Sequence, residues 1–132
     1  MQYLLDTHVC IWAIGAKERL SPKVREIIQY GDNEIVVSQV TFFEIAIKLK
    51  IGKLPDFEST VAQFINAVSS SGFRILPVKD EHLMAYTLFD FHGEHRDPFD
   101  RYLIATAQLE KMIMISKDEK FKLYTNQVEI VW

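Results

Sequence analysis

Four acidic residues are placed in the sequence where their side chains could bind one metal ion. Asp6 directly follows a short apolar run, Tyr3-Leu4-Leu5, and Asp118 comes shortly after another apolar run near the other end of the chain. Glu44 and Asp100 each fall in the first two turns of a predicted helix. Carboxylates held close together raise one another's pKa unless a cation neutralises them, and Mg²⁺ and Mn²⁺ favour such oxygen ligands. The set would suit metal-assisted hydrolysis.

Each acid also has an ordinary structural explanation. Asp6 and Asp118 could cap the helices that follow them, which is the commoner role of a lone Asp at such a place. Glu44 could form a surface pair with Lys48, which is four residues further along the same predicted helix. Taken singly, these residues therefore do not establish a metal site.

Asp97 and Asp100 mark the start of one predicted helix. Asp97 is interpreted as its N-cap, with Pro98 at the first helical position and Asp100 in the first turn, where negative charge suits the helix dipole. Capping and metal binding both stay open for Asp100, and Asp97 is a less certain metal ligand.

Other catalytic chemistries lack their residues. The histidines show no paired spacing with Cys or acids that is typical of zinc, so surface or packing roles are expected for His8, His82, His92 and His95. His8 could still approach the site, because it follows Asp6 closely. There is no glycine-rich phosphate loop, no Gly-x-Ser-x-Gly elbow and no Cys/His pair placed for nucleophilic catalysis. Metal-assisted hydrolysis is the chemistry that remains.

Length and composition indicate the class of protein. The chain has 132 residues, of which 48% are hydrophobic, so we expect one domain, residues 1–132, with a substantial core. A net charge of −3 argues against binding nucleic acid through bulk positive potential, although cations at an acidic site would reverse the local field. Cys10 is expected to be buried and reduced. With no signal peptide and no apolar stretch long enough for a membrane span, we expect a soluble, cytoplasmic protein.

Short apolar runs alternate with amphipathic stretches, and this alternation predicts an α/β fold with a mostly parallel sheet. Strands are expected at residues 3–5, 34–37, 74–78, 112–115 and 128–132. Helices are expected at residues 7–14, 22–30, 39–50, 56–70, 80–91 and 98–111, with a short helix or turn at 118–123. Pro77 suggests that the third strand frays early or lies at an edge. Because ligands bind at the carboxyl ends of parallel strands, the acids should meet there.

Four motifs cover essentially the whole chain. They are Tyr3-Leu4-Leu5-Asp6-Thr7-His8, Ser38-Gln39-Val40-Thr41-Phe42-Phe43-Glu44-Ile45, His95-Arg96-Asp97-Pro98-Phe99-Asp100-Arg101 and Ile115-Ser116-Lys117-Asp118. In this order they resemble the PilT N-terminus (PIN) domain, and more closely the VapC toxins of bacterial and archaeal toxin–antitoxin systems. One such motif is weak, but four in the right order are specific.

The resemblance implies a three-layer α/β/α sandwich with a central, mostly parallel sheet of about five strands. It places the family's acids on Asp6, Glu44, Asp100 and Asp118, with Asp97 as a second candidate for one position. We expect Asp6 and Asp100 to contact the metal directly. The resemblance further implies an endoribonuclease that cleaves RNA with Mg²⁺ or Mn²⁺, forms a homodimer, and is inhibited by a small antitoxin that also binds DNA.

Side chains next to the acids complete this hypothesis. Thr7 and Ser116 are expected to orient carboxylates or metal-bound water through hydrogen bonds, and the family has a Ser or Thr at the place of Ser116. Arg101, one residue after Asp100, is the preferred contact for an RNA phosphate, and Arg96 is a second candidate.

The predicted helix at 39–50 has two apolar faces, although packing against the sheet needs only one. One face carries Val40, Phe43 and Ile47, and the other carries Phe42, Ile45 and Leu49. Together with Phe57, Val61 and Phe64 of the following segment, the second face could form a groove for an antitoxin. Ordinary packing between the two consecutive helices is an equally good explanation.

Three other functions are compatible with parts of the sequence. A PIN-type nuclease could serve RNA processing outside any toxin system, although the short chain favours the toxin. An inactive interaction module could keep the fold without catalysis, but the presence of all four acids argues against it. A Mg²⁺-binding phosphoacceptor signalling domain would need an acidic pair at the first strand, where Asp6 stands alone.

Overall fold

Five parallel strands form the centre of the fold. The computed structural model describes residues 1–132, and its strands are β1 (Gln2–Leu5), β2 (Glu34–Ser38), β3 (Arg74–Leu76), β4 (Ile113–Ile115) and β5 (Ile130–Val131). Their order across the sheet is β3-β2-β1-β4-β5, and every neighbouring pair is parallel. The prediction of a parallel sheet of about five strands is confirmed. β3 is an edge strand that ends before Pro77, which has no N–H to donate to a neighbour.

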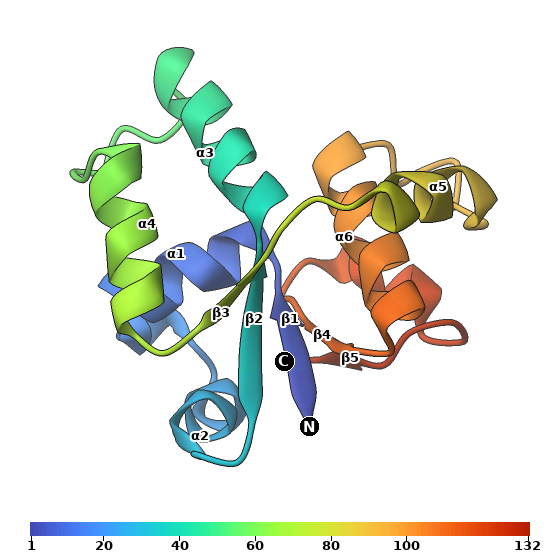
Figure 1. The fold of residues 1–132 in the computed structure, drawn as a ribbon, viewed down its shortest axis with the longest axis horizontal. Coiled ribbons are helices and arrows are strands. Elements are labelled where there is room, and N and C mark those ends of the chain that lie inside the picture. The colour runs from blue at the N-terminus through green and yellow to red at the C-terminus, as the bar shows by residue number, and fades with distance from the viewer.

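Helices cover both faces of this sheet (Figure 1). On one side are α1 (Thr7–Gly15), α2 (Pro22–Gln29), α3 (Gln39–Lys50) and α4 (Val61–Ser70), and on the other are α5 (Asp80–Leu88) and α6 (Pro98–Glu110). Two short 3₁₀ helices, η1 (Lys17–Arg19) and η2 (Glu119–Tyr124), complete the elements. The predicted three-layer α/β/α architecture is confirmed. None of the helices has the length and apolar character that crossing a membrane requires.

Alternate strand residues fill two cores, one on each face of the sheet. In β1, Tyr3 and Leu5 belong to the core under α1 to α4, whereas Leu4 belongs to the core under α6. Val36 of β2 and Met114 of β4 lie in this second core as well. Strands that are buried on both faces have continuous apolar sequences, which is why these strands could be predicted from the sequence. The carboxyl ends of β1 and β4 are therefore firmly anchored.

Two helices are shorter than predicted. α4 begins at Val61 and not at Asp56, because Thr60 and Gln63 form a capping box. The Thr60 hydroxyl accepts a hydrogen bond from the Gln63 amide (3.1 Å), and the Gln63 side chain accepts one from the Thr60 amide (2.9 Å). α5 ends early, at Leu88, because the aromatic residues after it turn into the second core.

Candidate metal centre

Asp6 lies at the carboxyl end of β1, where both the sheet and α1 fix its position. Its Oδ1 caps α1 by accepting a hydrogen bond from the Val9 amide at 2.8 Å, and its Oδ2 accepts one from the Ser116 hydroxyl. The Ser116 oxygen in turn accepts from the Asp118 amide at 3.0 Å, so β1 and the end of β4 are tied together here. Burial raises the pKa of Asp6, and the hydrogen bonds offset only part of this. The carboxylate is therefore costly to ionise without a nearby cation.

Glu44 reaches the same edge of the sheet from α3. Ser38 caps this helix, and its hydroxyl accepts a hydrogen bond from the Val40 amide at 3.2 Å. The Glu44 carboxylate is buried, with the Thr7 hydroxyl donating to Oε1 at 2.6 Å and Lys48 Nζ lying 2.7 Å from Oε2. Burial lowers the pKa of Lys48, but the hydrogen bond and charge of Glu44 outweigh it and raise that pKa. The expected pair with Lys48 exists, but its carboxylate lies inside the protein.

Asp100 lies in the first turn of α6, half-buried. Asp97 is the N-cap of this helix, as predicted, and its Oδ1 accepts hydrogen bonds from first-turn amides that include that of Asp100 at 3.0 Å. Burial, and after it the negative charges of Asp97, Glu44, Asp6 and Asp118, raise the pKa of Asp100 to about 8. These interactions show that α6 brings Asp100 within electrostatic range of all the other acids.

The acids surround a common region without yet forming a closed coordination site. Asp6 and Asp118 line one small hollow together. Asp118 is exposed and caps η2 by accepting from the Lys120 amide at 2.9 Å. None of Asp6, Asp100 and Asp118 forms an ion pair with a Lys or Arg. No three His, Cys, Asp or Glu side chains are close enough together to hold a metal ion as they stand. A bound cation would have to draw the carboxylates inward.

His95 is a site neighbour that the sequence did not reveal. It is fully buried, with Nδ1 2.8 Å from the Tyr124 hydroxyl and Nε2 3.4 Å from Asp100 Oδ2. The Tyr124 oxygen also accepts from the His92 amide at 3.2 Å, so Tyr124 ties the ring to the loop before α6. The other ring nitrogen, Nε2, faces the Asp100 side chain. The only signal in the sequence is that His95 precedes Asp100 in the same motif.

The two arginines predicted to bind substrate contact the loop before α6 instead. Arg101 donates hydrogen bonds to the carbonyl oxygens of His95 and His92, and its guanidinium lies over the Phe91 ring, 4.8 Å from the centroid. Arg96 donates to another carbonyl of this loop at 3.0 Å. Both side chains therefore brace the loop in this structure, and their contact with a substrate stays a prediction.

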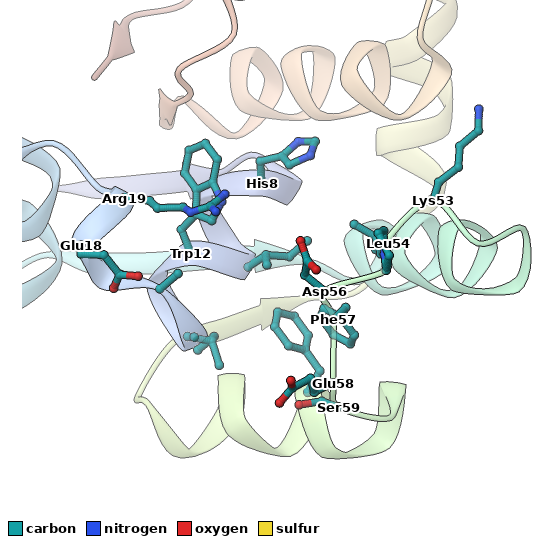
Figure 2. Close-up of a pocket in the computed structure, with 16 residues that line it drawn as sticks. His8, Trp12, Glu18, Arg19, Lys53, Leu54, Asp56, Phe57, Glu58 and Ser59 are labelled. Carbon is teal, nitrogen blue, oxygen red and sulfur yellow. The ribbon is translucent and has the colours of Figure 1, made fainter.

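A larger hollow adjoins the acidic region (Figure 2). It lies between α1 and the segment that joins α3 to α4, and it shares His8 and Trp12 with the small hollow of Asp6 and Asp118. Leu54 and the aromatic rings of α4 and the segment before it contribute its apolar wall. The two hollows are therefore neighbours that share part of α1 as a wall.

Aromatic rings pack between α3 and α4 where the groove was predicted, but an apolar hollow remains beside them, lined by Phe42 and Phe43 of α3, Ile65 of α4 and Ile75 of β3. Phe42 and Phe64 meet edge to face with ring centroids 6.1 Å apart, and Phe57 lies 5.3 Å from Phe64. Phe57 and Phe64 do line a hollow, but its opposite wall is α1 and not α3. On the other face of α3, Phe43 is 61% exposed.

Comparison with known proteins agrees with the fold. Among solved structures, the chain is similar to VapBC2 from Rickettsia felis bound to a promoter DNA fragment (TM-score 0.69, 16% identity, covering 100% of this chain and 99% of that chain). It is also similar to DNA-bound VapBC from Salmonella typhimurium (0.69, 15%, 99% and 97%) and to VapBC-5 from Mycobacterium tuberculosis (0.60, 19%, 98% and 97%). No curated protein sequence matches the chain. At such identities the structures establish a shared fold. The family model for the PIN domain matches residues 3–126, and the chain therefore belongs to the PIN domain family.

Proposed function

We propose that this chain is an endoribonuclease that hydrolyses RNA phosphodiesters with Mg²⁺ or Mn²⁺. The observation that carries the proposal is Asp100, a half-buried carboxylate with a pKa of about 8 and no Lys or Arg partner among several other acids. Acids that repel one another cost folding free energy, and such an arrangement suits a site that binds a cation. Membership of the PIN family supports the nuclease class.

The donor atoms fit a hard divalent cation. Asp6, Glu44, Asp100 and Asp118 offer only oxygen, which Mg²⁺ and Mn²⁺ prefer. Asp6 and Glu44 are buried and already oriented by hydroxyl groups, whereas Asp118 is exposed and Asp100 is half-buried. We expect the two less buried carboxylates to move toward the two buried ones when a cation binds.

Each residue then has a definite task. Asp6 and Asp100 hold the cation directly, and Glu44 and Asp118 complete the acidic site, with Asp97 as a further candidate ligand at its exposed rim. The Ser116 hydroxyl keeps Asp6 oriented, as the Thr7 hydroxyl does for Glu44. When bound, the cation polarises the scissile phosphate and lowers the pKa of the attacking water.

Within the nuclease class, we assign the chain as the toxin of a cytoplasmic toxin–antitoxin pair that a small cognate antitoxin inhibits. The similar VapBC structures support this assignment, because VapBC-5 is described as a member of a toxin–antitoxin family. The hollow in Figure 2 also supports it. Its apolar wall is accompanied by two basic and two acidic residues, Arg19, Lys53, Asp56 and Glu58, and such a lining suits an amphipathic segment. We further propose that the active form is a homodimer.

The nuclease proposal is tested with purified Asp6→Asn. We expect the variant to lose Mg²⁺-dependent cleavage of single-stranded RNA, because the amide cannot supply the charge that Asp6 brings to the cation. Asp32→Asn is the matched control, since Asp32 is exposed and contacts only the Tyr30 hydroxyl, and it should cleave normally. Unchanged cleavage by Asp6→Asn would show that the assignment is wrong.

The toxin role needs a separate experiment in cells. Induction of the chain alone should arrest growth, and co-expression of a short open reading frame adjoining its gene should relieve the arrest. The Asp6→Asn variant should have no effect on growth. Normal growth with an enzyme that cleaves RNA in vitro would favour an RNA-processing nuclease outside a toxin system.

A further inference from the structure

Trp12 is an aromatic side chain that lies directly beside the candidate metal centre. One hollow is lined by Asp6, His8, Trp12, Lys117 and Asp118, together with one apolar residue of α1. Trp12 is only partly buried, although a tryptophan in a core of this size could be covered completely. The hollow therefore presents an indole ring and two carboxylates to the same occupant.

The neighbours of Trp12 leave its ring available for stacking. Trp132 approaches edge-on, with centroids 6.0 Å apart and planes at 61°, and His8 is tilted by 47° at the same separation. Neither ring lies flat against the indole, so neither provides a stacked partner. A stacking surface of this kind, open to solvent next to the acids, suits a planar ligand.

Lys117 supplies a positive charge at the same place. Its Nζ lies 5.9 Å from the centre of the Trp12 ring, and it forms no ion pair with any carboxylate. Lys117 also lines a second hollow, together with Lys122 and Trp132. The two hollows share Lys117, so each of them is lined by a lysine and by an indole ring.

A lysine beside an indole ring suits a single nucleic acid strand, in which charged phosphates alternate with planar bases. We propose that Trp12 and Lys117 form a nucleotide subsite, in which Trp12 stacks on the base next to the scissile phosphate and Lys117 contacts the following phosphate. The inference rests on the proposed nuclease function, because the acids position the scissile phosphate. An RNA strand fits better than a protein segment, since an unpaired lysine over an aromatic ring favours an anionic ligand with planar groups.

Binding is measured separately from cleavage to test the subsite. The probe is a fluorescein-labelled single-stranded RNA 12-mer, and its anisotropy is recorded in EDTA, where metal-dependent cleavage stops. We expect Trp12→Leu to weaken binding about tenfold, since one base–aromatic stack is lost, and Trp12→Phe to keep most of the affinity. Tyr30→Leu is the control, because Tyr30 is an exposed aromatic residue that lines neither hollow, and its affinity should not change.

Lys117→Gln keeps the test decisive if Trp12→Leu does not fold, because Lys117 is exposed. It should lower RNA affinity and reduce the slope of log affinity against log salt by about 0.7. Unchanged RNA affinity in both folded variants would overturn the proposal, and so would a defect confined to binding of an antitoxin protein. If the wild type binds RNA through Trp12 but cleaves none, the subsite stands and the nuclease function fails.

Discussion

At the scale of single residues, the ionised carboxylate of Asp100 lowers the stability of the folded protein. Its pKa is about 8 in the folded chain, against 3.8 for an unperturbed Asp, because of burial and then of the surrounding acids. The folded protein therefore binds this proton more tightly than the unfolded chain. Its contribution to stability is fully present below pH 3.8 and is lost as the pH rises toward 8.

Asp100→Asn should therefore stabilise the metal-free protein at high pH. At pH 8.5 in EDTA we expect its Tm to exceed that of the wild type by about 2 to 6 °C, because the amide carries no charge to repel the other acids. The gain should shrink toward pH 5, where the wild-type carboxyl is already protonated. Adding Mn²⁺ should stabilise the wild type more than the variant. Differential scanning calorimetry measures both effects, and a lower Tm for the variant at pH 8.5 would contradict the electrostatic argument.

His95 should matter for metal affinity more than for folding. Its Nε2 lies 3.4 Å from Asp100 Oδ2, and the Tyr124 hydroxyl holds the ring through Nδ1 on the other side. We expect His95→Gln to weaken Mn²⁺ binding at least tenfold, as loss of a group that orients a ligand commonly does. Isothermal titration calorimetry with Mn²⁺ alone gives this readout without RNA.

His82 provides the matched control for this measurement. It is also fully buried and bonded to an acid, with Nε2 3.0 Å from Glu110, but it contacts none of the candidate ligands. His82→Gln should cost similar stability and leave Mn²⁺ affinity unchanged. Equal losses of Mn²⁺ affinity in the two variants would mean that His95 acts only through the stability of the fold.

At the scale of elements, helix caps set the positions of the acids. Ser38 caps α3 and thereby fixes the helix that carries Glu44, whereas Ser21 caps α2, which carries no candidate ligand. We expect Ser38→Ala and Ser21→Ala each to lower the free energy of unfolding by about 1 kcal/mol. Only Ser38→Ala should also weaken Mn²⁺ binding. Urea unfolding and calorimetry compare the two, and a loss of Mn²⁺ affinity in Ser21→Ala would show that stability alone governs the site.

The same caps explain how much of the fold could be predicted from the sequence. Ser21 and Asp97 each stand directly before a Pro, and Ser38 directly follows a short β-branched run, so the starts of α2, α3 and α6 were predicted correctly. The start of α4 was missed because Asp56 is an acceptable cap on composition, and only the capping box at Thr60 decides the matter. Asp56 and Thr60 are both acceptable caps by residue type, and the reciprocal hydrogen bonds between Thr60 and Gln63 select the second.

Burial of polar residues was harder to predict than the elements themselves. Asp6 and Asp118 could be placed at the sheet edge because each follows a strand, but His95 lies in a polar loop that suggests exposure. Its burial depends on Tyr124 and Phe121, which belong to η2 and are distant in the sequence. Such contacts between remote segments carry no local signal. The same limit applies to Arg101, whose attachment to the loop carbonyls became visible only in the structure.

At the scale of the whole molecule, one apolar surface has no partner within the chain. Leu83, Met84 and Leu88 of α5 are 53%, 63% and 81% exposed, on the outer side of the layer that α5 forms with α6. Large apolar side chains exposed together on one helix commonly mark an interface with another protein. We assign this surface to the proposed homodimer, since a twofold contact pairs the same face of both copies.

The double variant Met84→Glu/Leu88→Glu should therefore make the protein monomeric. Each copy would bring two carboxylates into the centre of an apolar contact, where like charges repel and lose their hydration. Sedimentation equilibrium should then give the mass of one chain, 15.4 kDa, where the wild type gives twice that mass. Tyr30→Glu should leave the dimer intact, because Tyr30 is an exposed aromatic residue at the end of α2, which lies on the other side of the sheet from α5. A dimer that persists in the double variant would place the interface elsewhere. Because the candidate ligands lie on β1, α3, α6 and the segment after β4, and none on α5, the monomer should still bind Mn²⁺ with wild-type affinity.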